Sequence, residues 1–352
     1  MYWKASGRKY FNKLEALSNA KDKLVENVDF ICHPEDYGSI DWAVEPTQSW
    51  DDMLLVRAKQ LRDEYKYLRL WYSGGSDSHT VLDTFVRNNI YIDEICVWRT
   101  SPSDQFDGYG NQEANKIAIP YLQTIKSLMP NTKINVIDIG AKEYLAFYGR
   151  DGWHRETTHI EMGPDNLYNL YEFFPQTLTQ PYGYCDIQGG DKPKITRRDD
   201  VYYARLTDSQ FELNLGFAHL EDFFTTPKYP ELHAKQCHLL KKVLSEKYPD
   251  QDITGQLYNP KLYEPNGTFI LDWYGCCRVL YKQELSLGKD WTIYNLKAVE
   301  HIDHAKQSNP DVLKNYFGTL NEELRTNKHW FNDGDISNRC IGILSEEYCL
   351  GA

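Results

Sequence analysis

Short apolar runs alternate with helix-like stretches through the middle of the chain. The runs are rich in β-branched and aromatic residues, and polar or glycine-rich positions bound them, as expected of buried strands. On this basis strands are predicted at residues 68–72, 94–98, 133–139 and 184–187. Because strands that alternate with helices form parallel sheets covered on both faces, the pattern predicts an α/β fold.

Apolar residues at helical spacing occupy the segments before and between these strands. The tetrapeptide at 49–52 (Ser-Trp-Asp-Asp) is typical of an N-cap box and predicts a helix that ends near Tyr65. The apolar face of this helix consists of Leu54, Ala58, Leu61 and Tyr65, and Arg57 lies at the margin of that face. Further helices are predicted at 10–20, 78–89 and 111–128, with a kink or division at Pro120. Residues 1–66 are therefore predicted to be an N-terminal helical segment.

The alternation of strands and helices is lost after residue 194. Residues 201–214 have the pattern of a polar hairpin, whereas 230–248 and 310–325 each begin with a proline, which is favoured in the first turn of a helix. Residues 196–352 are therefore predicted to form a mainly helical C-terminal region that binds a substrate or a partner.

Composition narrows the classes of function. The 352-residue chain has a formal net charge of -12, which disfavours extended nucleic-acid binding, although a local basic patch is compatible with it. The eight cysteines form no CxxC pair, so buried thiols are favoured over disulfides or a paired-knuckle zinc site. No apolar run reaches the roughly 18 residues of a membrane helix, and the N-terminus lacks a secretory pattern. These features predict a cytoplasmic protein that does not bind a membrane.

The sequence Ser-Gly-Gly-Ser-Asp-Ser at 73–78 lies where a predicted strand ends and a helix begins. At that position the unpaired N–H groups of the helix favour an anion, and glycine allows backbone angles that turn several N–H groups toward it. Asp77 would repel a phosphate unless a divalent cation lay between them. The stretch therefore predicts a phosphate site with a metal ion, and a glycine-rich turn with a helix cap is the alternative.

A second glycine turn follows the predicted strand at 184–187. It contains Gly189, Gly190, Asp191 and Lys192. A plain Gly-Gly-Asp turn and a second part of the phosphate site both fit this sequence.

The pattern at 73–78 resembles the SGGxDS motif of the PP-loop ATP pyrophosphatase superfamily and matches every specified position of it. The resemblance implies a HUP-like, parallel-sheet nucleotide-binding domain over residues 67–195, with ATP and Mg²⁺ as ligands. The nearest branch is similar to the synthetase domain of asparagine synthetases, in which a later turn reads GxGxDE. Here Lys192 stands where that branch has Glu.

The resemblance also implies roles for individual residues. ATP would be split between its α and β phosphates, which adenylates a small-molecule or nucleotide acceptor for attack by a nitrogen or sulfur nucleophile. The expected catalytic residues are Asp77, Asp191 and Lys192, of which the two aspartates would carry Mg²⁺. The expected nucleotide-binding residues are Ser73, Gly74, Gly75, Ser76, Ser78, Val97, Trp98, Arg99, Gly189 and Gly190.

Two other classes of function remain open. Cys276, Cys277 and Cys349 resemble the cysteine motifs of PAPS and APS reductases, which share the nucleotide-binding fold, although buried thiols are the favoured interpretation. A non-catalytic nucleotide-binding protein also fits the sequence. Weaker candidate ligand or metal residues are Trp153, His154, Arg155, Lys194, Arg197, Arg198, His233, His238, His301 and His304.

Overall fold

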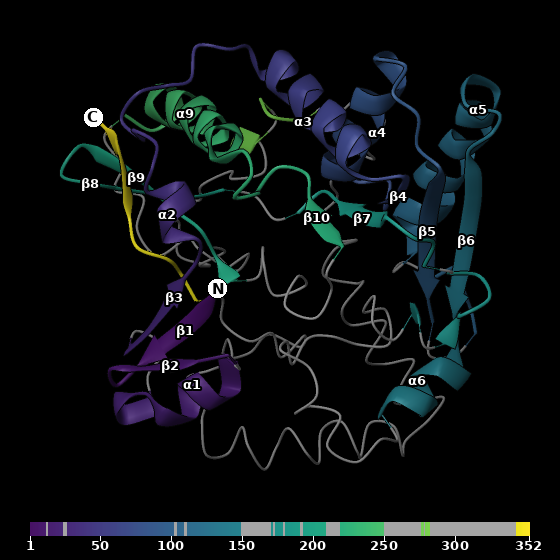
Figure 1. Cartoon of the computed structure of the whole chain (residues 1–352), viewed down its shortest axis with the longest axis horizontal. Helices are drawn as coiled ribbons and strands as arrows, with labels where there is room; N and C mark the ends of the chain where they lie inside the picture. The colour runs from purple at the N-terminus through teal and green to yellow at the C-terminus, as the bar shows by residue number, and fades with distance from the viewer. Residues whose placement is uncertain are drawn as a thin grey trace, which may run out of the picture.

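Two antiparallel sheets, one parallel sheet and several helices make up the part of the chain that the structure describes (Figure 1). The computed structural model describes residues 1–11, 13–23, 27–101, 104–108, 111–148, 170–171, 173–178, 180–190, 193–208, 219–249, 276–277, 279–281 and 343–352. The predicted helix at 310–325 lies outside these residues.

The central element is a five-stranded parallel sheet. Its strands are β4 (Tyr67–Trp71), β5 (Glu94–Thr100), β6 (Lys133–Ile139), β7 (Tyr184–Gln188) and β10 (Leu220–Asp222), in the spatial order β10-β7-β4-β5-β6. Every adjacent pair in it is parallel. The α/β fold and the four predicted strands are therefore confirmed. The fifth strand, β10, lies beyond residue 195, where the sequence analysis ended the nucleotide-binding domain.

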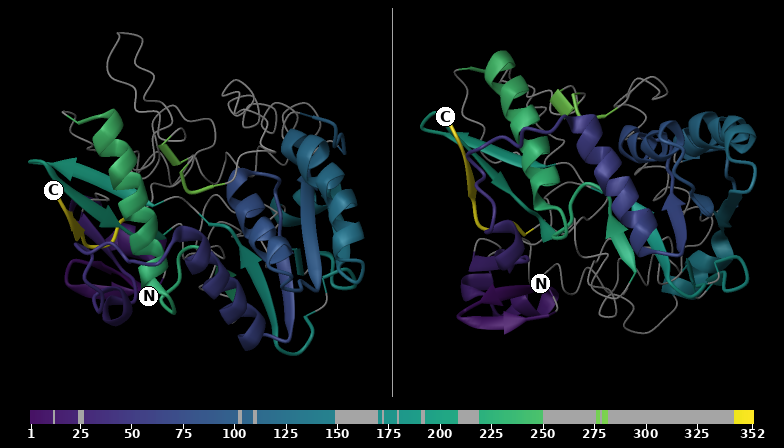
Figure 2. Two further views of the ribbon diagram at one scale, coloured as in Figure 1. Left: turned by 90° about the horizontal axis from the view of Figure 1, so that it is seen from above. Right: turned by 45° about the horizontal axis from the view of Figure 1, so that its top comes forward.

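Helices α3 (Trp50–Glu64) and α4 (Ser76–Arg87) pack on one face of this sheet, and α9 (Pro230–Lys247) packs beside α3. In Figures 1 and 2, α3 lies between α9 and α4, and it contacts both. The Ser49 hydroxyl accepts the Asp52 amide at 3.2 Å, which confirms the predicted N-cap. Arg57 was expected at the margin of the apolar face of α3, but its side chain is fully buried.

Three further helical elements connect the strands. A π-helix, η4 (Ala114–Ala118), runs into α5 (Ile119–Leu128), and α6 (Ala141–Tyr148) follows β6. Pro120 stands in the first turn of α5, directly after the π-helix, and the backbone stays helical through the junction, so the helix expected at 111–128 changes its type there without a break. The missing amide of a proline is tolerated in a first helical turn, whereas in a helix interior it removes a hydrogen bond.

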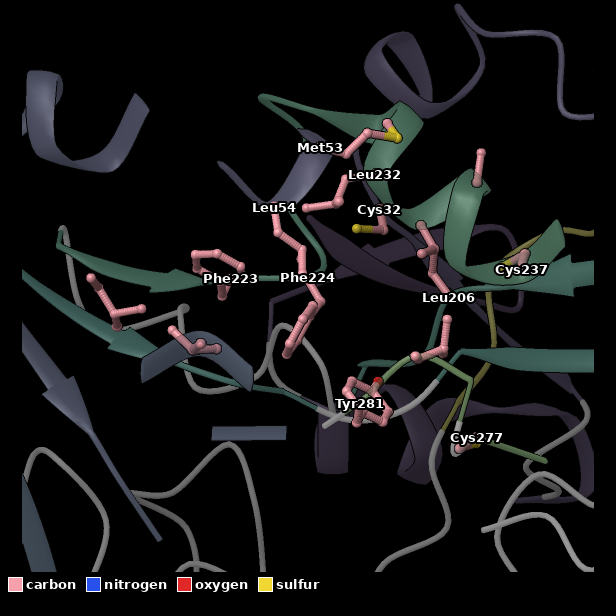
Figure 3. Packing of buried hydrophobic residues seen from close by; sticks show 14 of the residues in the cluster. Cys32, Met53, Leu54, Leu206, Phe223, Phe224, Leu232, Cys237, Cys277 and Tyr281 are labelled. Atoms are coloured by element: carbon pink, nitrogen blue, oxygen red, sulfur yellow. The ribbon is translucent and has the colours of Figure 1, made fainter. Parts of the chain in front are cut away.

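The apolar core lies between α3, α9 and the residues that follow β10. Figure 3 shows side chains from these three places in one cluster. The side chains labelled there are Cys32, Met53, Leu54, Leu206, Phe223, Phe224, Leu232, Cys237, Cys277 and Tyr281. Their burial attaches α9 and the strands beside it to the parallel sheet.

The N-terminal segment is not wholly helical, which corrects the sequence analysis. Strands β1 (Tyr2–Ala5), β2 (Arg8–Tyr10) and β3 (Val28–Ile31) form an antiparallel sheet in the order β2-β1-β3. The helices of this segment are α1 (Lys13–Asn19), η1 (Lys21–Lys23), α2 (Pro34–Tyr37) and α3. Each of the three strands has only three or four residues, so its period-2 pattern is too short to recognise in the sequence.

The hairpin after the second glycine turn also differs from the prediction. It joins β8 (Lys194–Arg198) to β9 (Val201–Arg205), so it begins one strand earlier than expected. Strand β11 (Tyr348–Gly351) pairs with β9. The described part of residues 196–352 therefore combines strands with the predicted helix at 230–248, which is observed as α9.

Six of the cysteines are buried free thiols in the described parts of the chain, as expected. They are Cys32, Cys96, Cys185, Cys237, Cys276 and Cys277, whereas Cys349 is exposed. Within the described ranges, no helix combines the length and the apolar character that crossing a bilayer requires.

His233 on α9 links stability to pH. Its ring is fully buried, Nδ1 lies 3.1 Å from the Thr225 hydroxyl, and burial lowers its pKa to about 3. Between the ordinary pKa of 6.5 and this value, the unfolded chain binds a proton that the native chain does not. The His233 contribution to stability should therefore be lost as pH falls, by up to about 1.4 kcal/mol per pH unit.

A His233→Gln variant removes this titration. Urea unfolding at pH 7, 6, 5 and 4 should give a shallower loss of unfolding free energy for His233→Gln than for the unaltered protein. His219→Gln, at a partly exposed position, is the control and should keep the original slope. Equal slopes for His233→Gln and the unaltered protein would contradict the assignment.

Candidate functional site

The turn at 73–78 lies at the carboxyl end of the central strand. Strand β4 ends at Trp71, and α4 begins at Ser76. The chain leaves β4 toward β5 on one side, and β7 pairs with β4 on the other side. The order of the sheet therefore reverses between β4 and β7, and open parallel sheets bind ligands beyond the carboxyl ends of their strands at such a switch point.

Gly74 requires glycine for two separate reasons. Its φ of +83° lies in the left-handed region, where side chains with a Cβ are strained. A Cβ on Gly74 would also lie 2.9 Å from the Glu113 carbonyl oxygen and 3.1 Å from the Ala118 amide nitrogen. The turn thus packs directly against the π-helix η4, which supports it from behind.

Two hydroxyls hold the turn open. Ser73 Oγ accepts the Gly75 amide at 3.2 Å, and Ser78 Oγ accepts the Ser73 amide at 3.2 Å. The two hydroxyl oxygens lie 3.1 Å apart. The amides of Gly74, Ser76 and Ser78 donate no hydrogen bond to a described residue. These N–H groups, at the start of a 12-residue helix, can therefore bind an anion.

The accessible side of the turn carries a carboxylate and a hydroxyl. Asp77 and Ser76 are partly exposed, and Ser76 Oγ donates to Asp77 Oδ1 at 3.2 Å. Oxygen donors of this kind suit Mg²⁺. Among the described residues no three His, Cys, Asp or Glu side chains form a metal site. Of the two aspartates expected to carry Mg²⁺, Asp77 is the one within the described residues. The other predicted ligand, Asp191, and Lys192 lie outside the described residues.

The second glycine turn touches the first. A Cβ on Gly189 would lie 3.1 Å from the carbonyl carbon of Asp77 and 3.2 Å from the amide nitrogen of Ser78. Only a residue without a side chain allows the backbone after β7 to approach the first turn of α4 so closely. Two segments about 110 residues apart in sequence therefore lie in contact at the carboxyl ends of β4 and β7.

Asp222, at the end of β10, is a residue of this region that the sequence analysis missed. A Cβ on Gly190 would lie 1.7 Å from Asp222 Oδ2, so the carboxylate packs directly on that glycine. Asp222 Oδ1 accepts the amides of Phe224 and Thr225 at 2.8 and 2.7 Å, which fixes the orientation of the carboxylate. The second turn is thereby held between the first turn and Asp222.

Arg57 on α3 ties this strand end to the helices. It donates to the Asp222 carbonyl oxygen at 3.0 Å and to Glu221 Oε2 at 2.8 Å. The isolated Leu-Glu-Asp of β10 carries no strand pattern in the sequence, so no sequence signal pointed to either contact.

The predicted base-binding residues lie on β5, next to β4. Val97 is fully buried, and the ring of Trp98 packs on that of Trp71 with centroids 5.0 Å apart. Arg99 forms a bidentate pair with Asp138 on β6, with two N–O distances of 2.7 Å, and also donates to Asn115 Oδ1. Arg99 is therefore engaged in an ion pair with the neighbouring strand.

The weaker candidates are dispersed. Arg197 and Arg198 pair with Asp200 and Glu347, and Lys194 is buried at the start of β8. His233 and His238 are buried on α9, where His238 Nε2 lies 2.9 Å from the Trp42 carbonyl oxygen. The candidates at 153–155, 301 and 304 lie outside the described residues.

The cost of a side chain at Gly74 tests the packing of the first turn. Gly7 provides a matched control, because its φ is +77° but a Cβ there meets nothing within 4 Å. Gly7→Ala should lower the unfolding free energy by about 1–2 kcal/mol, from backbone strain alone. Gly74→Ala adds the clash with η4 and should lower it by about 2–5 kcal/mol in urea unfolding. Equal costs would show that η4 does not press on the turn.

Comparisons with known proteins identify no relative of this chain. No protein-family model, no curated protein and no solved structure matches the chain. Any function must therefore be argued from the two glycine turns themselves.

Proposed function

We propose that the two glycine turns bind the phosphates of ATP and that the protein is a PP-loop-type ATP pyrophosphatase. The observation that carries the proposal is the contact between Gly189 and the backbone of Asp77 and Ser78. It brings the second predicted part of a phosphate site onto the first, at the switch point of a parallel sheet.

The chemistry of the first turn supports an anionic ligand. Three amides without described partners, the positive end of α4 and the hydroxyls of Ser73, Ser76 and Ser78 provide donors for phosphate oxygens. Asp77 among these donors is consistent with a ligand that arrives with a cation, because a carboxylate beside bare phosphate is repulsive.

The donor set fits Mg²⁺. Asp77 would hold it together with Asp191, and when bound the ion would neutralise charge on the phosphates. Ser73, Gly74, Gly75, Ser76, Ser78, Gly189 and Gly190 would hold the pyrophosphate portion of ATP. Lys192 would stabilise negative charge on the departing pyrophosphate. The backbone of Val97 and Trp98 would meet the adenine, with Arg99 beside it.

The proposed reaction divides ATP between the α and β phosphates. An acceptor oxygen on a small molecule or nucleotide forms a bond to the α-phosphorus, and pyrophosphate leaves with the electrons of the broken P–O bond. A nitrogen or sulfur nucleophile then displaces AMP from the acceptor. Positioning and charge neutralisation supply the rate, so no side-chain nucleophile is needed.

The reductase alternative receives less support from the cysteines. Cys276 and Cys277 are buried, and burial of a thiol disfavours the reactive thiolate. Cys349 is exposed but lies on β11, which Figure 1 draws on the opposite side of the molecule from β4, β5 and β6.

ATP binding with variants of both turns tests the proposal. In calorimetry, Asp77→Asn should weaken binding of ATP with Mg²⁺ about tenfold or more, and should weaken binding in EDTA much less, because the carboxylate acts through the metal. Asp83→Asn, which removes a charge from the second turn of the same helix, should bind as the unaltered protein does. Gly189→Ala should weaken binding under both conditions, since its Cβ displaces the first turn.

The products of ATP test the reaction. With a pool of small-molecule and nucleotide acceptors, chromatography should find AMP and pyrophosphate in equal amounts. ADP and phosphate without AMP would contradict the proposed cleavage, and no ATP binding by the unaltered protein would contradict the site.

A further inference from the structure

Each of three adjacent strands carries one charged side chain on the face of the sheet that is turned away from α3 and α4. Arg69 on β4 is in register with Glu94 on β5 and with Asp186 on β7. Their exposed fractions are 0%, 0% and 2%, so all three charges lie in the interior. The sequence analysis assigned them no role.

The guanidinium of Arg69 joins the two neighbouring strands. Its Nε donates to Glu94 Oε2 at 2.7 Å, and Nη1 lies 3.4 Å from Asp186 Oδ1. Nη1 also donates to the Tyr171 hydroxyl at 2.6 Å. The rings of Tyr67, Tyr171 and Tyr184 surround the cation, with centroids 5.7–6.0 Å from Cζ.

Asp186 connects this cation to the carboxyl end of β4. Trp71, the last residue of that strand, donates its indole N–H to Asp186 Oδ1 at 2.9 Å, and the Tyr171 hydroxyl donates to Oδ2. Trp71 stands two residues before Ser73, where the first glycine turn begins, and Asp186 stands three residues before Gly189. We call Arg69, Trp71, Glu94, Tyr171 and Asp186 the Arg69 group.

Stability alone does not explain such a group. Moving ions out of water costs free energy that their mutual attraction often fails to recover, and apolar replacements of buried ion pairs are frequently neutral or stabilising. The attested use of buried polar groups is to specify one arrangement among several. In this sheet the arrangement in question is how the ends of β4 and β7 lie beside each other.

We propose that Arg69, Asp186 and Trp71 are positioning residues that set the distance between the two glycine turns. This inference rests on the proposed function for its purpose but not for its geometry. Gly189 approaches Asp77 and Ser78 so closely that a Cβ would fall at 3.1–3.3 Å, so a shift of β7 along β4 would change how the two turns meet. Main-chain ladder bonds run along both strands, whereas the Arg69 group provides side-chain contacts across the strand pair just before both turns.

Hydrogen exchange tests the positioning without any ligand. The variant Arg69→Met/Glu94→Gln/Asp186→Asn removes all three charges and keeps neutral groups of similar size. The hydrogen-bonded amides of Ser73, Gly75, His79 and Asp186 should exchange about tenfold faster or more in it, while strands β1 to β3 exchange as before and the melting temperature changes little. Lys13→Met/Asp208→Asn removes another buried ion pair, 2.9 Å apart, and should leave both turns unaffected.

Two outcomes would overturn the inference. One is unchanged exchange of both turns in the folded triple variant. The other is faster exchange throughout the protein in proportion to lost stability, which is the signature of a merely structural group. Should the triple variant fail to fold, Asp186→Asn alone decides between the same outcomes, because it keeps the acceptor for Trp71 and removes the one for the Tyr171 hydroxyl.

A second measurement separates this inference from the proposed function. If the unaltered protein turns over ATP, Asp186→Asn should lower kcat by up to about a hundredfold and change KM less, as expected of misplaced catalytic groups. Unchanged kcat and KM would overturn the positioning role and leave the proposed function intact. Absence of ATP binding in the unaltered protein would remove the proposed function, and the exchange experiment would still decide the positioning role.

Discussion

The close approach of Gly189 to the first turn of α4 is the constraint on which the site depends. It places the backbone after β7 within van der Waals contact of Asp77 and Ser78, and it depends on the absence of a Cβ at Gly189. Other contacts surround this pair of turns. The π-helix η4 lies behind Gly74, and the Asp222 carboxylate lies against Gly190. Because Gly189 has no side chain, the backbone after β7 can lie directly against the backbone of the first turn of α4.

The charged groups near these turns are of two kinds, accessible and buried. Asp77 lies on the accessible side of the first turn, at the start of α4. Arg69 is buried between Glu94 and Asp186, and each of these charges has a partner of opposite sign. Burial raises the pKa of Asp186, and the guanidinium of Arg69 opposes that shift. The interior charges are therefore fixed in place, and only the accessible ones are available to a ligand.

Much of the fold could be predicted from the sequence, because its signals are local. The strands β4 to β7 are apolar runs bounded by polar residues. Ser49 caps α3 through its hydroxyl, and Pro120 stands in the first turn of α5, so both signals act within a few residues of their own position. The contacts that were missed are not local. Arg57 and Arg69 look like surface residues until α3 meets β10 and β4 meets β7. Likewise, the three residues of β10 form a strand because β7 offers a free side for pairing, which their own propensity does not indicate.

Strand β10 also determines what part of the chain can stand alone. It pairs with β7 on the side away from β4, and it is followed by the phenylalanines that reach the core of α3 and α9. A fragment that stopped at residue 195 would leave β7 as an unpaired edge, which invites association with other chains. Gly190 would then lack its neighbouring carboxylate as well. During synthesis, the parallel sheet can accordingly gain its fifth strand only after residues 220–222 have emerged from the ribosome.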